Sequence, residues 1–297
     1  MRLCSCLLWR FGSILALFIV LIVHGDAWAD LMSLESYSHW VDVTNQPAAG
    51  TWTKLDGDYP VTSQGELVAA PEHGTAIPRT GATLLDLRTE NQYEPDNANN
   101  GANYNYTIST GDFGGVDPAM LSSGTVELDF WICPNTWSGD TNGFVPEGVI
   151  YQETSLLNGT GDIVASVGMR SQGDSNSPEV WYRVGGDSWI DTGLIADSST
   201  WTNVNMFVDL VGMTSRISFT DTEGDTEMSA DLAWDSGITD TSVTTLNFQM
   251  IDGVTKNYFD DFAFTAIAVA VPEPSSTLAG VAAVLAFASR RRRREWA

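Results

Sequence analysis

The chain has 297 residues and a formal net charge of −24 at pH 7, from 38 acidic and only 14 basic side chains. This charge argues against nucleic acid and anionic membrane surfaces as partners, because both repel an acidic protein. Of the three cysteines, only Cys133 lies beyond residue 29, so no intrachain disulfide is expected in the rest of the chain.

Residues 1–29 have the three parts of a secretory signal peptide. Arg2 and Arg10 form a basic region, Phe11–Val23 is apolar, and Ala27 and Ala29 flank a small-x-small cleavage site. Thirteen apolar residues are short for a permanent anchor, which needs about 20. We therefore expect a signal helix that is removed on export.

Strand patterning dominates residues 30–270, where runs of β-branched and aromatic residues alternate with clusters of Gly, Asp, Asn and Ser. Looser strand-like pieces come first, at Trp40–Val43, Thr51–Trp52, Glu66–Ala69 and Tyr104–Ser109. The clearer predicted strands follow: Thr125–Ile132, Val149–Glu153, Ile163–Arg170, Val180–Val184, Asn203–Val211, Arg216–Thr220, Glu227–Ala233, Thr244–Met250 and Tyr258–Ala266.

Several of these strands alternate between apolar and polar residues, as in Val126-Glu127-Leu128-Asp129-Phe130. Many antiparallel strands in a segment of this length predict one all-β domain over residues 30–270, a two-sheet antiparallel β-sandwich or jelly roll. Three pieces resemble the concanavalin A-like (laminin-G-like) superfamily: Ser123–Trp131, Trp201–Leu210 with its hairpin partner, and Tyr258–Phe264 with its pair of aspartates. The resemblance implies a sandwich of the lectin and glucanase type.

Glu127 and Asp129 are the sharpest catalytic candidates in the chain. Two carboxylates at i and i+2 on one strand lie about 6.5 Å apart, within the range used in sugar hydrolysis. The laminarinase-type glycosidases carry such a pair followed three residues later by a second catalytic glutamate, and Ile132 stands at that position here. We therefore expect no catalytic residue and a protein that is not an enzyme. A polysaccharide-active, glycoside hydrolase-like enzyme using Glu127 or Asp129 is the alternative.

Tryptophans are abundant, with 11 in the chain, and they suggest a glycan-binding surface. An indole ring stacks on the apolar face of a sugar, while carboxylates and amides bind its hydroxyl groups. Trp131, on the same strand as Glu127 and Asp129, and the loop residue Trp137 are the main candidates, together with Trp181 and Trp189. Packing in the sandwich is the competing interpretation for each ring.

A calcium ion is the one cofactor that the sequence suggests, because laminin-G-like modules often hold one at a loop rim. Asp221, Glu223 and Asp225 alternate on one predicted hairpin and are weak candidate ligands. Acidic turns are common in so acidic a chain, so solvation alone also accounts for them.

Residues 271–297 form a tail of three parts. Pro272, Glu273 and Pro274 open it, because two prolines exclude a regular helix or central strand. An apolar block, Leu278–Ala288, follows and would be helical in lipid, although eleven residues span only about 16 Å. The tail closes on a cluster of arginines: Arg290, Arg291, Arg292, Arg293 and Arg294.

This tail resembles a PEP-CTERM sorting signal, the tag of exported bacterial proteins that a membrane protease, exosortase, processes. The matching features are the Pro-Glu-Pro motif, the short apolar helix and the terminal arginines, with Glu295-Trp296-Ala297 as an addition. The resemblance implies transient insertion in the inner membrane, then release to the cell surface or to an extracellular polysaccharide matrix. There the domain would bind glycan or serve as a structural component.

Overall fold

The computed structural model describes the following residues: 28–30, 43–45, 52–55, 65–70, 78–79, 83–89, 102–108, 122–136, 147–172, 177–186, 188–197, 200–220, 224–250 and 255–267. Within these ranges every regular element is a β-strand, apart from the short 3-10 helix η2 (Val43–Asn45). No helix among them is long and apolar enough to cross a membrane. Residues 1–27 of the predicted signal peptide and the whole predicted tail, residues 271–297, lie outside the described residues.

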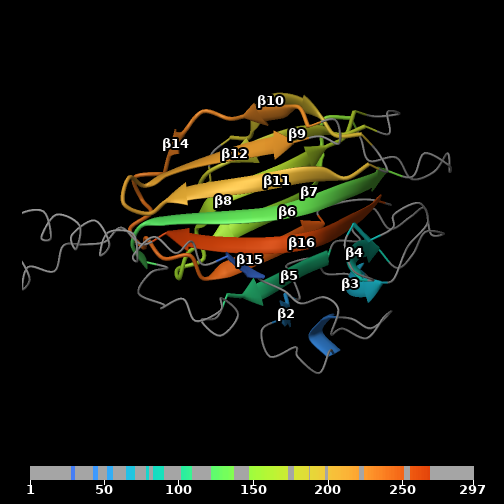
Figure 1. The fold of residues 1–297 in the computed structure, drawn as a ribbon, viewed down its shortest axis with the longest axis horizontal. Coiled ribbons are helices and arrows are strands. Elements are labelled where there is room, and N and C mark those ends of the chain that lie inside the picture. Colours follow the sequence, from blue (N-terminus) through green and yellow to red (C-terminus); the bar gives the residue numbers. More distant parts are fainter. Residues whose placement is uncertain are drawn as a thin grey trace, which may run out of the picture. The chain divides into compact units, whose positions relative to one another are not determined.

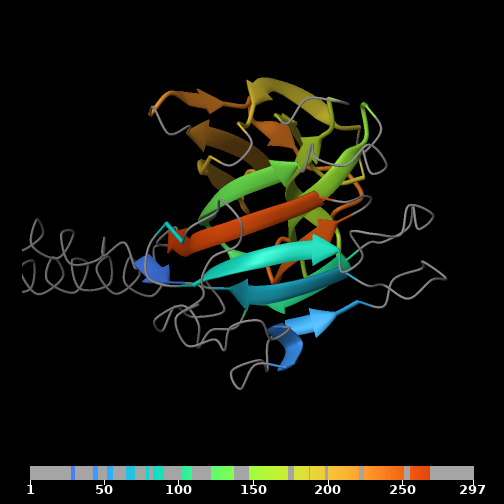
Figure 2. The ribbon, with the colours of Figure 1, turned by 90° about the vertical axis from the view of Figure 1, so that its right-hand side faces the viewer.

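Two antiparallel sheets form a sandwich, which confirms the predicted fold class (Figure 1, Figure 2). Sheet A has the order β13 (Thr226–Met228), β12 (Thr214–Thr220), β11 (Thr202–Asp209), β6 (Thr125–Thr136), β16 (Thr255–Ile267), β4 (Leu84–Thr89) and β3 (Gly65–Ala70). Beside this path, β1 (Trp28–Asp30) pairs with β16 and β14 (Leu232–Ala233) pairs with β12. Sheet B has the order β10 (Ile190–Ile195), β9 (Glu179–Arg183), β8 (Ile163–Arg170), β7 (Ile150–Leu157), β15 (Thr245–Met250), β5 (Ala102–Thr107) and β2 (Trp52–Lys54).

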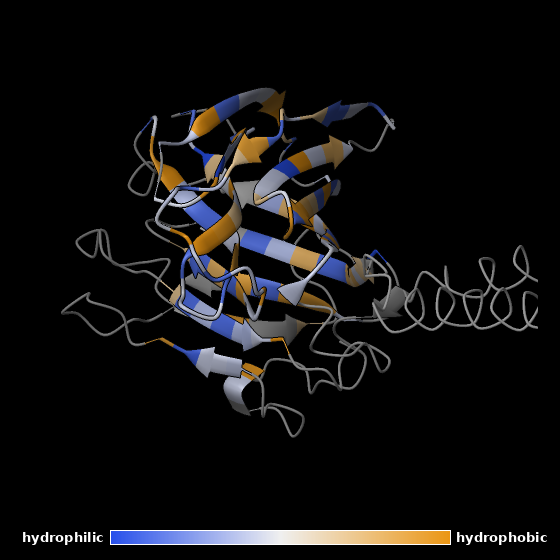
Figure 3. Cartoon of the chain, turned by 90° about the vertical axis from the view of Figure 1, so that its left-hand side faces the viewer, coloured by the Kyte–Doolittle hydropathy of each residue, from blue (hydrophilic) through white to orange (hydrophobic). Residues whose placement is uncertain are grey.

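Hydrophobic and hydrophilic residues alternate along several strands (Figure 3), and this alternation decides which face of those strands is buried. On β6, Val126, Leu128 and Phe130 are completely buried, while the carboxylates between them are partly exposed. β11 follows the same period, with alternate buried and partly exposed residues from Thr202 to Asp209. Because successive side chains of a strand point to opposite faces, β6 and β11 keep a polar outer face, whereas β7 and β8 of sheet B are buried on both faces.

The sequence misplaced a few strands. The predicted strand Glu227–Ala233 is wrong: β13 and β14 are separate short strands that pair with opposite ends of β12. Strands β4 and β10 were not predicted, and β10 lacks clean alternation because its register shifts between Asp191 and Leu194. In place of the predicted strand Trp40–Val43, the structure has Val43 in η2, and the other three residues lie outside the described ranges.

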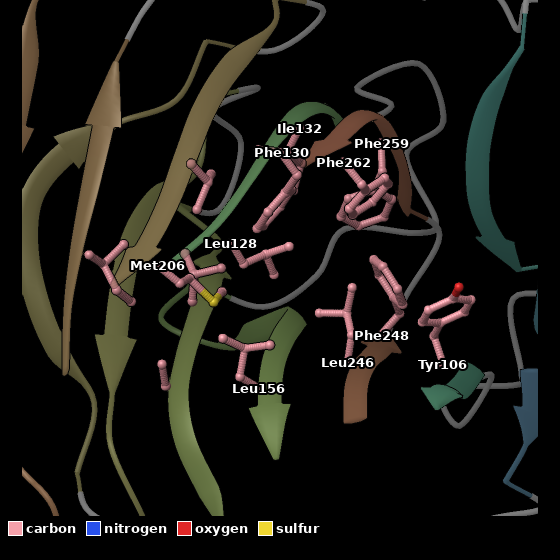
Figure 4. Packing of buried hydrophobic residues seen from close by; sticks show 14 of the residues in the cluster. Tyr106, Leu128, Phe130, Ile132, Leu156, Met206, Leu246, Phe248, Phe259 and Phe262 are labelled. Atoms are coloured by element: carbon pink, nitrogen blue, oxygen red, sulfur yellow. The ribbon is translucent and has the colours of Figure 1, made fainter. Parts of the chain in front are cut away.

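Four phenylalanines join the two sheets at the centre of the core (Figure 4). Phe130 comes from β6, Phe259 and Phe262 come from β16, and Phe248 reaches them from β15 of the opposite sheet. The Phe130 and Phe262 rings stack at 5.5 Å and 12°. Phe248 meets Phe259 and Phe262 edge-on, at 5.0 and 5.7 Å between ring centroids. Both geometries are favourable aromatic contacts.

A β-bulge in β16 makes this cluster possible. Phe259 and Phe262 are three residues apart, so a regular strand would direct them to opposite faces. The pairing with β6 shifts between Asp260 and Ala263, so that Asp261 and Phe262 both lie opposite Phe130 and β16 has one extra residue there. Asp261 has a left-handed backbone, with φ of 52°, as expected where a bulge bends a strand. Both rings therefore enter the core.

Cys133 is buried, as the sequence predicts, at 1% exposure against Tyr258 and Leu84. Burial raises the pKa of its thiol to about 12. A thiol in this environment is almost entirely protonated at neutral pH and is a poor nucleophile.

The left-handed backbone at Asp261 gives a test of the bulge. Asp261→Gly and Asp261→Val both lose the carboxylate, so the difference between them isolates the backbone. Glycine adopts a positive φ freely, whereas a β-branched residue is strained there. We expect the free energy of unfolding of the valine variant to be lower by about 1–2 kcal/mol, measured by urea denaturation. Equal stability of the two variants would contradict the described bulge.

Candidate functional site

Glu127 and Asp129 lie on the outer face of sheet A, at its middle strand β6. β11 pairs on one side, placing Phe207 opposite Glu127 and Asn205 opposite Asp129. β16 pairs on the other side, placing Thr265 opposite Glu127. Both carboxylates are partly exposed, as the alternation of β6 predicts.

Two asparagines of β11 bind these carboxylates. Asn205 donates through Nδ2 to Oε1 of Glu127. Asn203 donates through Nδ2 to Oδ1 of Asp129 at 2.9 Å and to the carbonyl of Phe130 at 3.3 Å. A carboxylate has about four acceptor sites, so both groups keep capacity for further donors such as hydroxyls. The sequence did not single out the asparagines, because only the register of β11 brings them beside β6.

Trp131 continues the same outer row, beyond Asp129, as predicted. The guanidinium carbon of Arg79 lies 3.4 Å from the centroid of its ring, a cation–π contact. The Arg79 side chain also pairs with Asp261 at 3.1 Å, and its backbone N–H donates to Asp260 at 2.6 Å. The β16 bulge thus holds an arginine over the ring that we expected to stack on sugar, so a ligand must share the ring with Arg79 or displace it.

Burial raises the pKa of the Asp129 carboxyl above its ordinary value. The nearby charge of Glu127 adds to this shift, whereas hydrogen bonds from Asn203 and Asn205 and the charge of Arg79 oppose it. Desolvation is the largest cause, because a partly buried carboxylate loses contact with water. Ionisation of Asp129 is therefore less favourable in the folded protein than in water.

Ile132, at the position of the missing catalytic glutamate, points into the core and is completely buried. Regular alternation from Glu127 through Asp129 puts residue 131 on the outer face and residue 132 inside. The β6 strand therefore presents Glu127, Asp129 and Trp131 together, and no third carboxylate follows them on its described outer face.

The remaining predicted site residues are only partly described. Trp137, Asp221, Glu223, Ala27 and the sorting motif lie outside the described residues. Asp225 lies beside β13, away from the Glu127 row. Ala29 belongs to β1 and pairs with Phe264, so the predicted cleavage site falls within a strand paired with β16. Among the described residues, no group of three or more His, Cys, Asp or Glu side chains is arranged to hold a metal ion.

The outer face of sheet B carries a polar cluster that the sequence did not reveal. Glu153 is 2% exposed and accepts hydrogen bonds from Arg183 at 2.7 and 2.9 Å. Ser155 and Ser166 donate to the same carboxylate at 2.9 and 2.7 Å. These residues come from three different strands, so no local pattern links them. The hydrogen bonds of the Glu153 carboxylate are therefore supplied within its own sheet, and its ion pair with Arg183 is structural.

Trp181 and Trp189, the other candidate aromatic residues, lie near this cluster. The guanidinium of Arg170 is 4.4 Å from the Trp181 ring, and that of Arg183 is 4.6 Å from the Trp189 ring. Trp189 packs on Gly168, where a Cβ would fall 2.6 Å from the ring. Trp189 therefore packs against the outer face of sheet B, between Gly168 and Arg183.

No family model matches the chain, and no curated protein matches it. Among solved structures, a sialidase aligns with a TM-score of 0.45 and 6% identity over 79% of this chain, which spans only 19% of the sialidase. A carbohydrate esterase of Shiga toxin-encoding bacteriophage phi24B aligns with a TM-score of 0.43 and 11% identity, covering 73% of this chain and 91% of that chain. Peanut lectin aligns with a TM-score of 0.42 and 11% identity, covering 73% and 97%. No residue role, ligand or activity follows for this chain from likenesses this weak.

The raised pKa of Asp129 predicts a stability that depends on pH. In the unfolded chain the Asp129 carboxyl has its ordinary pKa of 3.8, whereas in the folded chain its pKa is higher. Stability is therefore lost as the pH rises through this window, and the ionised carboxylate is unfavourable at pH 7. Asp129→Asn keeps an acceptor for Asn203 without the charge. We expect it to raise the melting temperature at pH 7, with the gain disappearing below about pH 4. A variant less stable than the wild type at pH 7 would contradict this assignment.

Proposed function

We propose that this protein is an exported, non-enzymatic β-sandwich that binds a neutral glycan on the outer face of sheet A. The observation that carries the proposal is the row of carboxylates and amides formed by Glu127, Asp129, Asn203 and Asn205, continued by Trp131. Sugar hydroxyls both donate and accept hydrogen bonds, so they match a surface where acceptors alternate with amide donors.

The negative charge of the chain favours a neutral glycan over an acidic one. A net charge of −24 repels polyanionic polysaccharides at low ionic strength. The only basic group described in the candidate site is Arg79, which is already paired with Asp261 and stacked on Trp131. A neutral polysaccharide therefore fits the site better than an acidic one.

Binding is tested with the purified full chain in a screen of neutral polysaccharides, by isothermal titration with Ca²⁺ and with chelator. We expect saturable binding that Trp131→Leu weakens at least tenfold, because losing one aromatic contact of about 1.4 kcal/mol changes affinity tenfold. Trp181→Leu is the matched control, since Trp181 also lies under an arginine but on sheet B. Loss on chelation would establish that binding requires calcium, the one cofactor that the sequence suggests.

Two results would contradict this proposal. Absence of saturable binding to any glycan would leave a structural matrix component as the better interpretation. Hydrolysis of a β-glucan that disappears in Glu127→Gln would instead establish the enzymatic alternative, because that substitution removes the carboxylate and keeps the shape of the side chain.

The export route is the second half of the proposal. The signal sequence and the tail support delivery across the inner membrane, processing by an exosortase-type membrane protease, and release to the cell surface or the extracellular matrix. The apolar block Leu278–Ala288 is too short for a stable anchor, which suits a segment that is held only until cleavage.

Sorting is tested by replacing Pro272, Glu273 and Pro274 with alanine in a bacterium that carries an exosortase. We expect the variant to accumulate uncleaved in the membrane fraction, while the wild type is released, as followed by immunoblotting of fractions. Replacing Ser275 and Ser276 with alanine is the matched control and should not change release. Equal processing of all three chains would contradict the assignment of the motif.

A further inference from the structure

A cleft of about 380 Å³ opens between the two sheets at one edge of the sandwich. Its walls come from the edge strands β10 of sheet B and β13 of sheet A, together with their neighbours β9 and β12. Figure 1 shows β10 and β12 at the same end of the molecule. The cleft lies apart from the Glu127 row, which occupies the middle of the outer face of sheet A.

The floor of the cleft is apolar. Val180 and Phe219 reach it from the core and are 1% and 3% exposed, and Ala196 is buried beside them. Leu194 packs against the core at the same place. Ile195, which also lines the cleft, is 58% exposed at the mouth. The edge thus offers apolar contact area to a partner.

The rim of the cleft is acidic. Asp197, Asp225 and Glu227 are exposed carboxylates at its mouth, and the partly exposed Thr200 adds a hydroxyl. No lysine or arginine occurs among the described lining residues. Three exposed carboxylates at the mouth of one cleft favour a cationic ligand and repel an anionic one.

The edge strands β10 and β13 can pair with an added extended peptide. Among the described strands, β10 pairs only with β9 and β13 pairs only with β12. An unpaired strand edge is a template for an added peptide strand, whose alternate side chains then face opposite directions. Such a strand places apolar side chains over the floor and basic side chains at the rim.

We propose that this cleft binds an extended peptide segment of a partner protein in which apolar residues alternate with arginine or lysine. This interaction is independent of glycan binding, because none of its residues belongs to the Glu127 row. It gives the protein a second, protein-directed surface at the edge of the sandwich.

The test uses fluorescence anisotropy with the purified full chain and a fluorescein-labelled octapeptide of alternating leucine and arginine. We expect saturable binding that weakens with salt, and a roughly five- to tenfold loss of affinity in the double variant Asp225→Asn, Glu227→Gln. Ile195→Thr, which removes apolar surface but keeps a β-branched side chain, should also weaken binding.

Glu147→Gln with Asp231→Asn is the matched control, because it removes two exposed carboxylates that do not line the cleft. We expect this control to bind like the wild type. Equal losses in the control and cleft variants would overturn the proposal, since they would show general attraction to an acidic protein. Equal affinity for a leucine–glutamate octapeptide, or no saturable binding, would also overturn it.

Discussion

The bulge in β16 is the local feature on which both the core and the candidate site depend. One extra residue in β16 places two residues opposite Phe130 and turns Phe259 and Phe262 to the same face, where they meet Phe248 of the other sheet. The same insertion places Asp260 and Asp261 beside Trp131, where they hold Arg79 by its backbone and its side chain. One backbone irregularity therefore fixes the contact between the sheets and the electrostatics of an outer face. A change that straightened β16 would disturb both at once.

Several of the few basic side chains of this acidic chain lie over aromatic rings. Five basic residues, Lys54, Arg79, Arg170, Arg183 and Arg216, lie within 3.4 to 5.5 Å of the centroid of an aromatic ring. Stacking of this kind desolvates a cation at little cost and stiffens the ring beneath it. The rings on the two outer faces are therefore partly covered, and a ligand that stacks on one must compete with an arginine.

The two surfaces with proposed roles differ in how their carboxylates are satisfied. On the outer face of sheet A, asparagines donate hydrogen bonds to the carboxylates but leave other acceptor positions open. Neutral hydroxyl groups can donate to these positions. At the edge cleft, the described lining residues include carboxylates above an apolar floor and no lysine or arginine, which suits a basic and apolar peptide. The buried Glu153 carboxylate is a third case, since Arg183 and two serines satisfy it within its own sheet. The chemistry of the neighbours, rather than the number of acids, distinguishes these sites.

Much of the fold was determined by the sequence alone, because strand alternation is a local property with a period of two. The pattern around Glu127 and Asp129 correctly predicted which side chains face outward, and the strand Ile163–Arg170 was predicted to the residue. Contacts between strands distant in sequence depend on register, so only the tertiary structure brought Asn203 and Asn205 to the carboxylates, Arg79 to Trp131, and Arg183 to Glu153. The bulge in β16 and the edge cleft were also beyond local patterns, since a bulge is defined by the partner strand and a cleft by two sheet edges. Local alternation specified the faces, and long-range pairing decided what meets on them.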